Sequence, residues 1–383
     1  MSIAQYTICI SPHQVPLAEA VVNLVGPEAY RYVYKIPLTE RRKKLGWGEA
    51  SKSWMIAEYE DFTAARKVLC DADILISGER DLELFERRLS ARLYTVYSAE
   101  RWFKPLLGMW RLLSPSYFRM AWRFVKMLRQ NEKMFCYPMG AHAAADMARL
   151  CGLFSGDLRC IFRAPAIAFE RRPGGKIWLR GGLAENDCRY CLHKMRMWGY
   201  VVAPSSGERR ARSQSGKLRL LWVGRFLKWK RVDTIIRAVV ENKQNHSVEV
   251  TRLEIVVDIY GSGPEEARLK MLAVGNEDVI HFHPPVPNDE VRQLMREYDV
   301  YVLSSNAYEG WGAVVSEALA EGMKVVGTYE AGSSATILPE SNLFHAGDWR
   351  GLLNVLRRGQ AFVDADTWSA ASFAKMLVMG PKG

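Results

Sequence analysis

The chain has 383 residues, 49% of them hydrophobic, and a formal net charge of +11. This length exceeds what one hydrophobic core usually organises, so two domains are expected. No run of eighteen apolar residues occurs, so no membrane-spanning helix is predicted. Seven scattered cysteines indicate a reducing, cytoplasmic compartment rather than a disulfide framework.

The N-terminal half begins with a predicted strand rather than a signal peptide, because residues 1–10 lack a basic start and a cleavage site. Short apolar runs then alternate with helical patterns. The predicted strands are Tyr6–Ile10, Ile74–Ile76 and Tyr94–Tyr97, and the predicted helices are Phe62–Cys70 and Ala141–Cys151. This alternation predicts βαβ units and a parallel sheet.

The basic excess of the chain lies in this half. Residues 1–200 contain 31 basic and 20 acidic side chains, whereas the remainder contains 22 of each. Within Pro115–Arg129, a predicted amphipathic helix carries Arg119, Arg123 and Lys126 on one face. Such a helix can lie on an anionic membrane surface. The alternative is a core helix with a solvated basic stripe.

Residues 204–216 form a predicted linker, because they are polar, small and aperiodic. After it, strands are predicted at Leu218–Val223, Leu253–Tyr260, Val279–Phe282, Asp299–Leu303 and Lys324–Gly327, and helices at Val232–Glu241, Glu265–Leu272, Asp289–Glu297 and Val314–Glu321. The predicted fold class is α/β, with two doubly wound parallel-sheet domains, 1–203 and 217–360, whose strand ends face a ligand cleft. A C-terminal helix is expected within 361–383, packing back toward the N-terminal domain.

Two cations follow the first strand of the C-terminal half. Arg225 and Lys230 are expected to project from a strand-to-helix loop. Cations there would stabilise a leaving diphosphate, on which negative charge grows as a glycosidic bond breaks. Arginine offers a bidentate fork and lysine a compact charge.

A glycine turn, Gly261-Ser-Gly263-Pro264, follows the next predicted strand. Pro264 suits the first helical position. The turn is not the full dinucleotide fingerprint, and no acidic residue is placed to indicate NAD. It can contact a nucleotide directly or serve only as a tight connection.

The segment Tyr308–Gly322 is the most informative in the chain. Glu309 and Glu317 flank a glycine-bracketed turn between a buried strand and an apolar helix. Gly310 and Gly312 allow a ligand to approach the backbone closely, and the start of a helix favours phosphate. Because carboxylates there accept hydrogen bonds from sugar hydroxyls, the inferred ligand is a nucleotide that carries a sugar.

In this order, the motifs Gly224-Arg225, Lys230, Gly261–Pro264, Ser304-Ser305 and Glu309…Glu317 resemble the donor-binding domain of the GT-B glycosyltransferases of family 4, which carry an E-x7-E motif. The resemblance covers residues 218–345. It implies transfer of a sugar from a nucleotide diphosphate-sugar (UDP-, GDP- or dTDP-linked) to a saccharide or lipid-linked acceptor, with retained configuration and no metal or other cofactor.

The resemblance also implies roles for individual residues. Arg225 and Lys230 would hold the donor diphosphate, and Glu309 would contact the transferred sugar. Glu317 would bond the ribose hydroxyls. The other donor-binding positions that it implies are Gly224, Gly261, Gly263, Gly310, Trp311, Gly312, Ala313 and Val314.

The N-terminal half departs from the family pattern, because Ile10–Pro16 replaces the glycine-rich loop that often follows the first strand. His13 lies in this segment and is a catalytic candidate. Glu100, Arg101 and His142 are acceptor-side candidates. Each of the four side chains can instead be structural.

Three stretches of this half, His13–Gly26, Ser98–Lys104 and Trp198–Tyr200, resemble bacterial enzymes that assemble surface polysaccharides such as capsule and exopolysaccharide. The expected partners are therefore a nucleotide-sugar, an acceptor and an anionic membrane surface, and the expected location is the inner face of the cell membrane.

A metal site is not predicted. Cys188, Cys191 and His193 invite a zinc interpretation, but no second ligand pair at metal spacing accompanies them. Two other activities on the same fold stay open, a hydrolysing sugar-nucleotide epimerase and a catalytically silent subunit that binds nucleotide or membrane. The basic half alone also fits a nucleic-acid binder, but the chain lacks a recognition motif for one.

Overall fold

The structure is a computed structural model, and it describes residues 1–44, 52–105, 107–156, 167–179, 191–200, 202, 204–205, 217–244, 253–361, 363 and 368–379. The chain divides into two compact units. The N-terminal unit comprises residues 1–43, 47–202 and 366–383, and the C-terminal unit comprises 44–46 and 203–365. Of the predicted linker, only residues 204 and 205 are described.

Six parallel strands form the sheet of the N-terminal unit, in the order β3-β2-β1-β4-β5-β6. They are β1 (Ile3–Thr7), β2 (Tyr30–Tyr34), β3 (Met55–Ala57), β4 (Ile74–Ser77), β5 (Tyr94–Ala99) and β6 (Met134–Pro138). The strand order reverses between β1 and β4, which is where doubly wound sheets bind their ligands.

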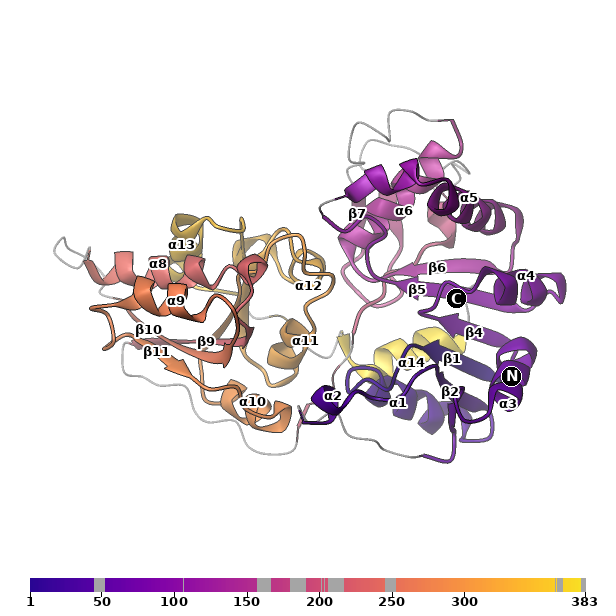
Figure 1. The fold of residues 1–383 in the computed structure, drawn as a ribbon, viewed down its shortest axis with the longest axis horizontal. Helices are drawn as coiled ribbons and strands as arrows, with labels where there is room; N and C mark the ends of the chain where they lie inside the picture. The colour runs from indigo at the N-terminus through magenta and orange to yellow at the C-terminus, as the bar shows by residue number, and fades with distance from the viewer. Residues whose placement is uncertain are drawn as a thin grey trace. The chain divides into compact units, whose positions relative to one another are not determined.

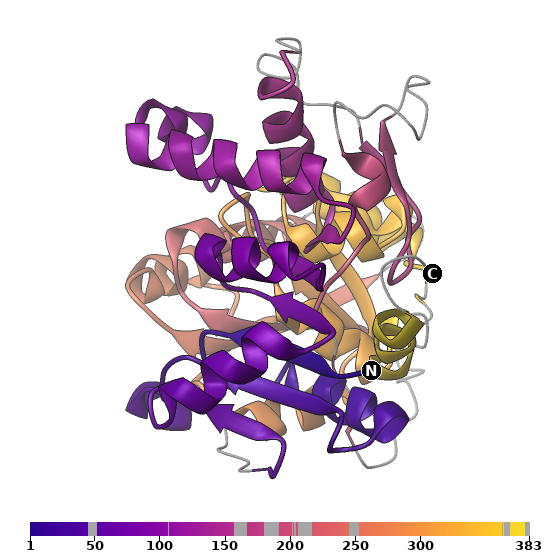
Figure 2. The same cartoon turned by 90° about the vertical axis from the view of Figure 1, so that its right-hand side faces the viewer.

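Helices cover both faces of this sheet (Figure 1), as the turned view also shows (Figure 2). They are α1 (Val15–Val25), α3 (Phe62–Asp71), α4 (Leu82–Ser90), α5 (Pro115–Gln130), α6 (Ala141–Leu153) and α14 (Ala370–Met379). Two short helices, α2 (Glu40–Lys44) and η1 (Gly108–Leu113), follow β2 and β5 in the chain. Helix α4 packs against α3 and α5, and α1 packs against α14.

The first strand differs from its prediction. It was expected at Tyr6–Ile10, but β1 spans Ile3–Thr7, and its ladder with β2 ends where Thr7 faces Tyr34. Gln5, in the middle of β1, is buried and accepts a hydrogen bond of 2.7 Å from the Tyr30 hydroxyl. A buried polar residue that a neighbouring strand satisfies is invisible to a hydrophobic pattern.

The C-terminal unit repeats the same topology, with the strand order β11-β10-β9-β12-β13-β14 and all pairs parallel. The strands are β9 (Lys217–Arg225), β10 (Glu254–Ser262), β11 (Ile280–His283), β12 (Val300–Leu303), β13 (Lys324–Thr328) and β14 (Leu343–Phe344). Each predicted strand of this half is present, with bounds that differ by a few residues at most.

Among the described residues of this unit, the α-helices that pack on the sheet are α8 (Val232–Gln244), α9 (Glu266–Ala273), α10 (Asn288–Met295), α11 (Ala313–Ala320), α12 (Gly332–Ile337) and α13 (Trp349–Arg358). Helix α8 contacts α9 and α13, whereas α11 contacts α10 and α12. The core between the sheet and helices α8, α9 and α13 contains Trp222, Ile236, Val257 and Leu352, all at most 2% exposed.

The helix expected within 361–383 is α14, and it belongs to the N-terminal unit. The Phe373 ring packs edge-on against Trp198, with 4.8 Å between the ring centroids. The same unit contains a small antiparallel pair, β7 (Ile167–Phe169) and β8 (Ile177–Leu179). Among the described residues, no helix has both the length and the apolar character needed to cross a membrane.

Candidate functional site in the C-terminal unit

The C-terminal sheet reverses its strand order between β9 and β12, which are hydrogen-bonded neighbours. Arg225 was expected in a loop, but it is the last residue of β9, because the ladder with β10 continues to Arg225 and Ser262. Lys230 ends the short helix η3 (Lys228–Lys230) in the loop that follows, and the loop after β12 contains Glu309. Because parallel neighbours end at the same edge of a sheet, the topology brings these two loops together. The backbone confirms the contact, since the Asn306 N–H donates to the Trp229 carbonyl over 2.9 Å.

The centre of the site is an ion pair between the Lys230 ammonium and Glu309 Oε2. The same oxygen accepts a hydrogen bond of 2.8 Å from the Ser305 hydroxyl. The Ser304 hydroxyl donates to the Lys230 carbonyl over 2.7 Å. Both charged side chains are mostly buried, with 18% of Lys230 and 12% of Glu309 exposed, so their attraction is less screened by water than that of a surface pair.

The loop after β12 leads directly into α11, whose first turn is open. Gly312 is the N-cap, with φ of +86°, a backbone conformation that favours glycine. A Cβ at this position would lie 3.1–3.2 Å from Leu303, Glu309 and Ser333 side-chain atoms. No side chain caps the helix. The Val315 N–H donates to the Gly312 carbonyl over 3.1 Å, so the N–H groups of Ala313 and Val314 are the ones available to an anion.

Glu317 lies on the second turn of α11 and is only 7% exposed. Its Oε1 accepts a hydrogen bond of 3.1 Å from the Asn288 amide at the start of α10. Burial raises the pKa of Glu317 to about 7, and the nearby Glu321 carboxylate adds to the rise, whereas Arg292 opposes it. Near neutral pH this carboxyl therefore changes between its charged and neutral forms.

Arg225 differs from Lys230 in its surroundings. Its side chain is exposed, and it pairs with no acid in the part of the chain that the structure describes. A guanidinium without a partner at this edge can bind a phosphate with two parallel hydrogen bonds.

The glycines of the two neighbouring turns are required by the protein itself. A Cβ at Gly261 would clash with the Gly224 carbonyl oxygen. A Cβ at Gly263 would lie 2.6–3.0 Å from three backbone atoms of Phe226. The loops after β9 and β10 therefore need glycine in order to pack, and this supports the tight-connection interpretation of the turn.

Two of the N-terminal candidates lie near Tyr200. The His13 ring is 5.7 Å from the Tyr200 ring, between centroids. Burial raises the pKa of Tyr200, and the Glu100 carboxylate contributes to that rise. Glu100 also forms an ion pair of 3.4 Å with Lys104.

The other two N-terminal candidates, Arg101 and His142, are both associated with α6. Arg101 forms an ion pair of 3.3 Å with Asp146, a fully buried carboxylate that also pairs with Arg149. The Phe103 N–H donates to the same carboxylate over 3.0 Å. This arrangement gives Arg101 a structural partner. His142 lies in the first turn of α6, after the N-cap Gly140.

The cysteine cluster of the sequence is described only in part, because Cys188 lies outside the described residues. Cys191 and Cys151 are both buried and carry no disulfide. Within the described ranges, no group of three or more His, Cys, Asp or Glu side chains could hold a metal ion.

Several residues of the site were not among the predicted site positions. Asn288 contacts Glu317 from α10, and the Trp229 ring lies 4.5 Å from the Lys230 ammonium. Thr328, at the end of β13, donates a hydrogen bond of 2.5 Å to the Ser305 carbonyl and so supports the residue that holds Glu309. No spacing pattern indicates these residues, because each comes from a different strand or helix.

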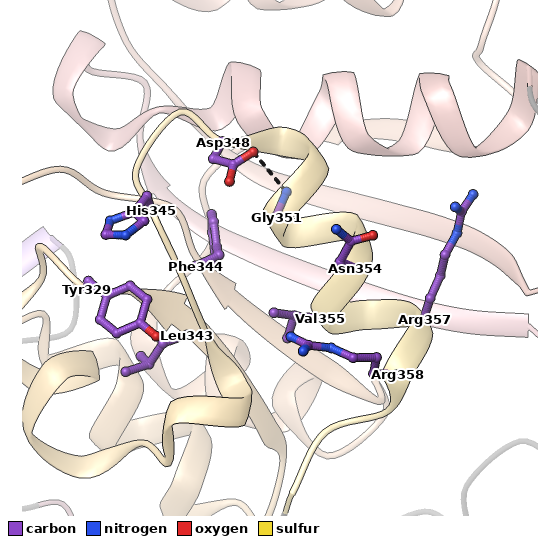
Figure 3. A pocket seen from close by; sticks show the side chains of 10 residues that line it. All are labelled: Tyr329, Leu343, Phe344, His345, Asp348, Gly351, Asn354, Val355, Arg357 and Arg358. Atoms are coloured by element: carbon purple, nitrogen blue, oxygen red, sulfur yellow. Dashed lines mark hydrogen bonds between the residues drawn. The ribbon is translucent and has the colours of Figure 1, made fainter.

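A pocket of the C-terminal unit lies along α13 and β14 (Figure 3). It contains none of the predicted site residues. Two of its polar groups are already engaged, since Asp348 accepts from the Gly351 N–H over 2.9 Å and Arg357 donates to Asn242 over 3.1 Å. The loops after β9 and β12 are therefore the better candidate site.

Comparison with known sequences finds matches to the C-terminal half of the chain. Residues 207–357 match the family described as Glycosyl transferases group 1. The chain is 32% identical over 151 residues to D-inositol 3-phosphate glycosyltransferase from Arthrobacter sp. (strain FB24), a match that covers 37% of this chain and 35% of that protein. It is 26% identical over 147 residues to the UDP-N-acetylglucosamine–peptide N-acetylglucosaminyltransferase GtfA subunit from Streptococcus pneumoniae serotype 4, covering 38% and 27%. The chain thus spans about a third of the length of these relatives.

Comparison with solved structures covers nearly the whole chain. Anabaena HepE in complex with UDP and glucose matches with a TM-score of 0.53 and 13% identity, over 99% of this chain and 94% of that one. The lipopolysaccharide outer core galactosyltransferase WaaB matches with a TM-score of 0.57 and 11% identity, over 99% and 98%. These likenesses establish the GT-B fold, with two parallel-sheet domains.

Proposed function

We propose that this GT-B protein is a glycosyltransferase that moves a sugar from a nucleotide diphosphate-sugar to a saccharide or lipid-linked acceptor. The observation that carries the proposal is the pairing of Lys230 with Glu309 where the C-terminal strand order reverses. It joins a cation suited to a diphosphate with a carboxylate suited to a sugar hydroxyl. The match of residues 207–357 to a glycosyltransferase family supports the same donor class.

Donor binding would exchange the partners of this ion pair. The diphosphate oxygens compete with Glu309 for the Lys230 ammonium, and the released carboxylate accepts a hydrogen bond from the sugar. A ligand that contains both groups satisfies both residues. A nucleotide diphosphate without the sugar leaves the Glu309 carboxylate without its cation, so the sugar should add to the affinity.

The leaving diphosphate would be stabilised by charges that the chain itself supplies. Arg225 at the end of β9, Lys230 at the end of η3 and the N–H groups of Ala313 and Val314 at the start of α11 would supply these charges. A carboxyl such as Glu317 can bond the ribose hydroxyls. We further propose that transfer needs no metal ion and retains the anomeric configuration, with the leaving phosphate accepting the proton of the acceptor hydroxyl. The sequence resemblance to family 4 supports both points.

The proposed acceptor side includes a membrane-facing surface, which we define as Leu107, Trp110, Leu113, Phe118 and Trp122 of η1 and α5. These apolar side chains are 43–75% exposed. Basic side chains lie among them, and Arg111, Arg119 and Lys126 pair with no acid among the described residues. Arg123 is different, because it pairs with Glu86 over 2.9 Å.

Exposed tryptophans next to unpaired cations suit the interface of an anionic bilayer. We therefore propose that the protein acts at the inner membrane surface, on an acceptor used for cell-surface polysaccharide. Sedimentation with vesicles containing anionic phosphatidylglycerol tests this, with neutral vesicles as the control. The double variant Trp110→Ser, Leu113→Ser should lose most of the binding. Equal sedimentation of this variant and the wild-type protein contradicts the proposal.

A two-step assay tests the activity. UDP-, GDP- and dTDP-sugars are first screened for thermal stabilisation, because a ligand that binds only the folded state raises its stability. Nucleotide release from the selected donor is then measured with and without saccharide acceptors. Release that depends on an acceptor supports transfer. Release without any acceptor indicates a hydrolysing epimerase, and no release with any donor indicates a silent binding subunit.

A further inference from the structure

The N-terminal unit contains a cavity of about 370 Å³ at its own strand-order reversal. It is lined by Tyr6, Lys35, Gly78, Glu79, Arg80, Asp81 and Tyr97. These residues come from β1, from β5 and from the loops after β2 and β4. The volume is within the range of small-molecule sites, roughly 300–1,000 Å³.

Most of the charges around this cavity are already compensated. Lys35 pairs with Glu79 over 3.2 Å. Asp81 pairs with Arg66 over 2.5 Å and also accepts from the Leu84 N–H at the start of α4. These residues offer polar groups to a ligand but no excess charge.

Arg80 is the exception. Its guanidinium stacks on the Trp102 ring, 3.8 Å from the centroid, and its Nε donates to the Tyr97 hydroxyl over 2.8 Å. One terminal nitrogen reaches only the Met120 thioether, over 3.6 Å.

Glu58 also lies beside this cavity, where it accepts a hydrogen bond of 2.6 Å from the Tyr6 hydroxyl and pairs with Arg66. The acids and bases around the cavity are therefore equal in number, but no carboxylate among the described residues pairs with Arg80, so its guanidinium is the charged group of the lining that has no ion-pair partner.

Tyr97 adds a second donor. Burial raises its pKa to about 12, so the hydroxyl keeps its proton. Its oxygen already accepts the Arg80 Nε–H, and its own hydrogen has no acceptor among the described residues. The buried rings of Tyr97 and Trp102, each 2% exposed, hold the guanidinium in place, so little freedom is lost on binding an anion.

We propose that this cavity binds the anionic group, a carboxylate or a phosphate, of a charged saccharide acceptor. The proposal rests on the proposed glycosyltransferase function and specifies its acceptor class. Arg80 and Tyr97 bind the anionic oxygens. The Lys35 ammonium and the Glu79 carboxylate, at the rim, bind hydroxyls of the sugar ring.

Calorimetric titration of the full chain with glucuronic acid, glucose 6-phosphate and neutral glucose tests the proposal. The wild-type protein should bind at least one anionic sugar more tightly than glucose. Arg80→Gln should weaken that binding by about tenfold or more and leave glucose binding unchanged. Arg80→Lys should give an intermediate loss, since it keeps the charge without the fork. Arg123→Gln, which removes a paired surface arginine, is the matched control and should bind like the wild-type protein.

The outcomes distinguish a carboxylate ligand from a phosphate ligand. They also distinguish failure of the cavity proposal from failure of the proposed glycosyltransferase function. Binding of glucuronic acid alone indicates a carboxylate-bearing acceptor, and binding of glucose 6-phosphate alone indicates a phosphorylated one. Failure of both anionic sugars to bind, or unchanged binding in Arg80→Gln, overturns the proposal. Stabilisation by nucleotide-sugars, measured on the same variants, reports on the C-terminal unit. It shows that a variant is folded, and its absence from the wild-type protein contradicts the proposed function rather than the cavity.

Discussion

The two units have the same strand order, but the edges at which we propose that they bind ligands differ in how their charges are paired. In the C-terminal unit, Lys230 and Glu309 satisfy each other, and a ligand must separate them. In the N-terminal unit, Arg80 is held by aromatic rings and has no carboxylate among the described residues. The topology determines where a ligand binds, whereas the pairing of charges at that edge determines which ligand can bind.

Removal of Lys230 should have the largest effect, because it destroys the pair that distinguishes the C-terminal edge. We expect Lys230→Ala to lower turnover by about 100- to 1,000-fold, the usual effect of removing one group that stabilises a developing charge. Steady-state nucleotide release with acceptor measures it. Lys228→Ala, on the same loop but exposed, is the control and should keep most activity. Similar losses in both variants would assign the effect to the loop as a whole.

Glu317→Gln should make the stability of the C-terminal unit less dependent on pH. The pKa of Glu317 is about 7 in the folded state against 4.5 unfolded. The folded protein therefore binds more protons than the unfolded protein between these values, and the stability that this carboxyl contributes falls as pH rises from 4.5 to about 7. Glutamine does not titrate and can still accept from Asn288.

Chemical denaturation at several pH values measures this difference. At about pH 5 the two proteins should differ little, and above about pH 7 the variant should be the more stable one by up to about 3 kcal/mol. A constant difference between them across the pH range would show that Glu317 titrates normally.

The N-terminal unit allows a buried ion pair to be compared with an exposed one. Arg101 belongs to the buried pair, because its partner Asp146 is fully buried. Arg101→Ala should lower the free energy of unfolding by about 2 kcal/mol, since a buried carboxylate loses one of its cations. Arg123→Ala breaks an exposed pair and should cost at most about 0.5 kcal/mol. Denaturant titration measures the free energy of unfolding of both variants. Equal losses in the two variants would contradict the structural role assigned to Arg101.

Unlike Arg101, Arg225 should affect ligand binding and not the free energy of unfolding, because its side chain is exposed and pairs with no described acid. Arg225→Ala should weaken the binding of a nucleoside diphosphate by about tenfold and leave thermal stability unchanged. Isothermal titration gives the affinity, with Arg237→Ala on the exposed side of α8 as the control. An unaltered affinity in Arg225→Ala would exclude this residue from the donor site.

The sequence predicted the C-terminal half well because its signals are local. Strands buried on both faces read as short apolar runs, and Glu309 and Glu317 belong to one continuous segment around the turn into α11. The pairing of Lys230 with Glu309 could not be read in advance, since it depends on β9 and β12 lying side by side although 79 residues separate the two side chains.

The N-terminal half was less predictable from the sequence, because its candidate site depends on contacts between residues that are far apart in the chain. Its cavity takes residues from two strands and two loops, and no short motif contains them. Arg80 lies in the segment Gly78-Glu-Arg-Asp81, which has the composition of an ordinary surface loop. Only its stacking on Trp102 and its hydrogen bond to Tyr97 distinguish it. None of the four candidates chosen by position, His13, Glu100, Arg101 and His142, lines this cavity.

The most direct test of the central claim is the turnover of Glu309→Gln with the donor selected by thermal stabilisation. This change removes the charge that pairs with Lys230 and keeps the size of the side chain. The account predicts that the variant still binds the nucleotide but transfers sugar at least about 100-fold more slowly, whereas Glu340→Gln, an exposed control, transfers normally. Wild-type turnover in Glu309→Gln would contradict the account.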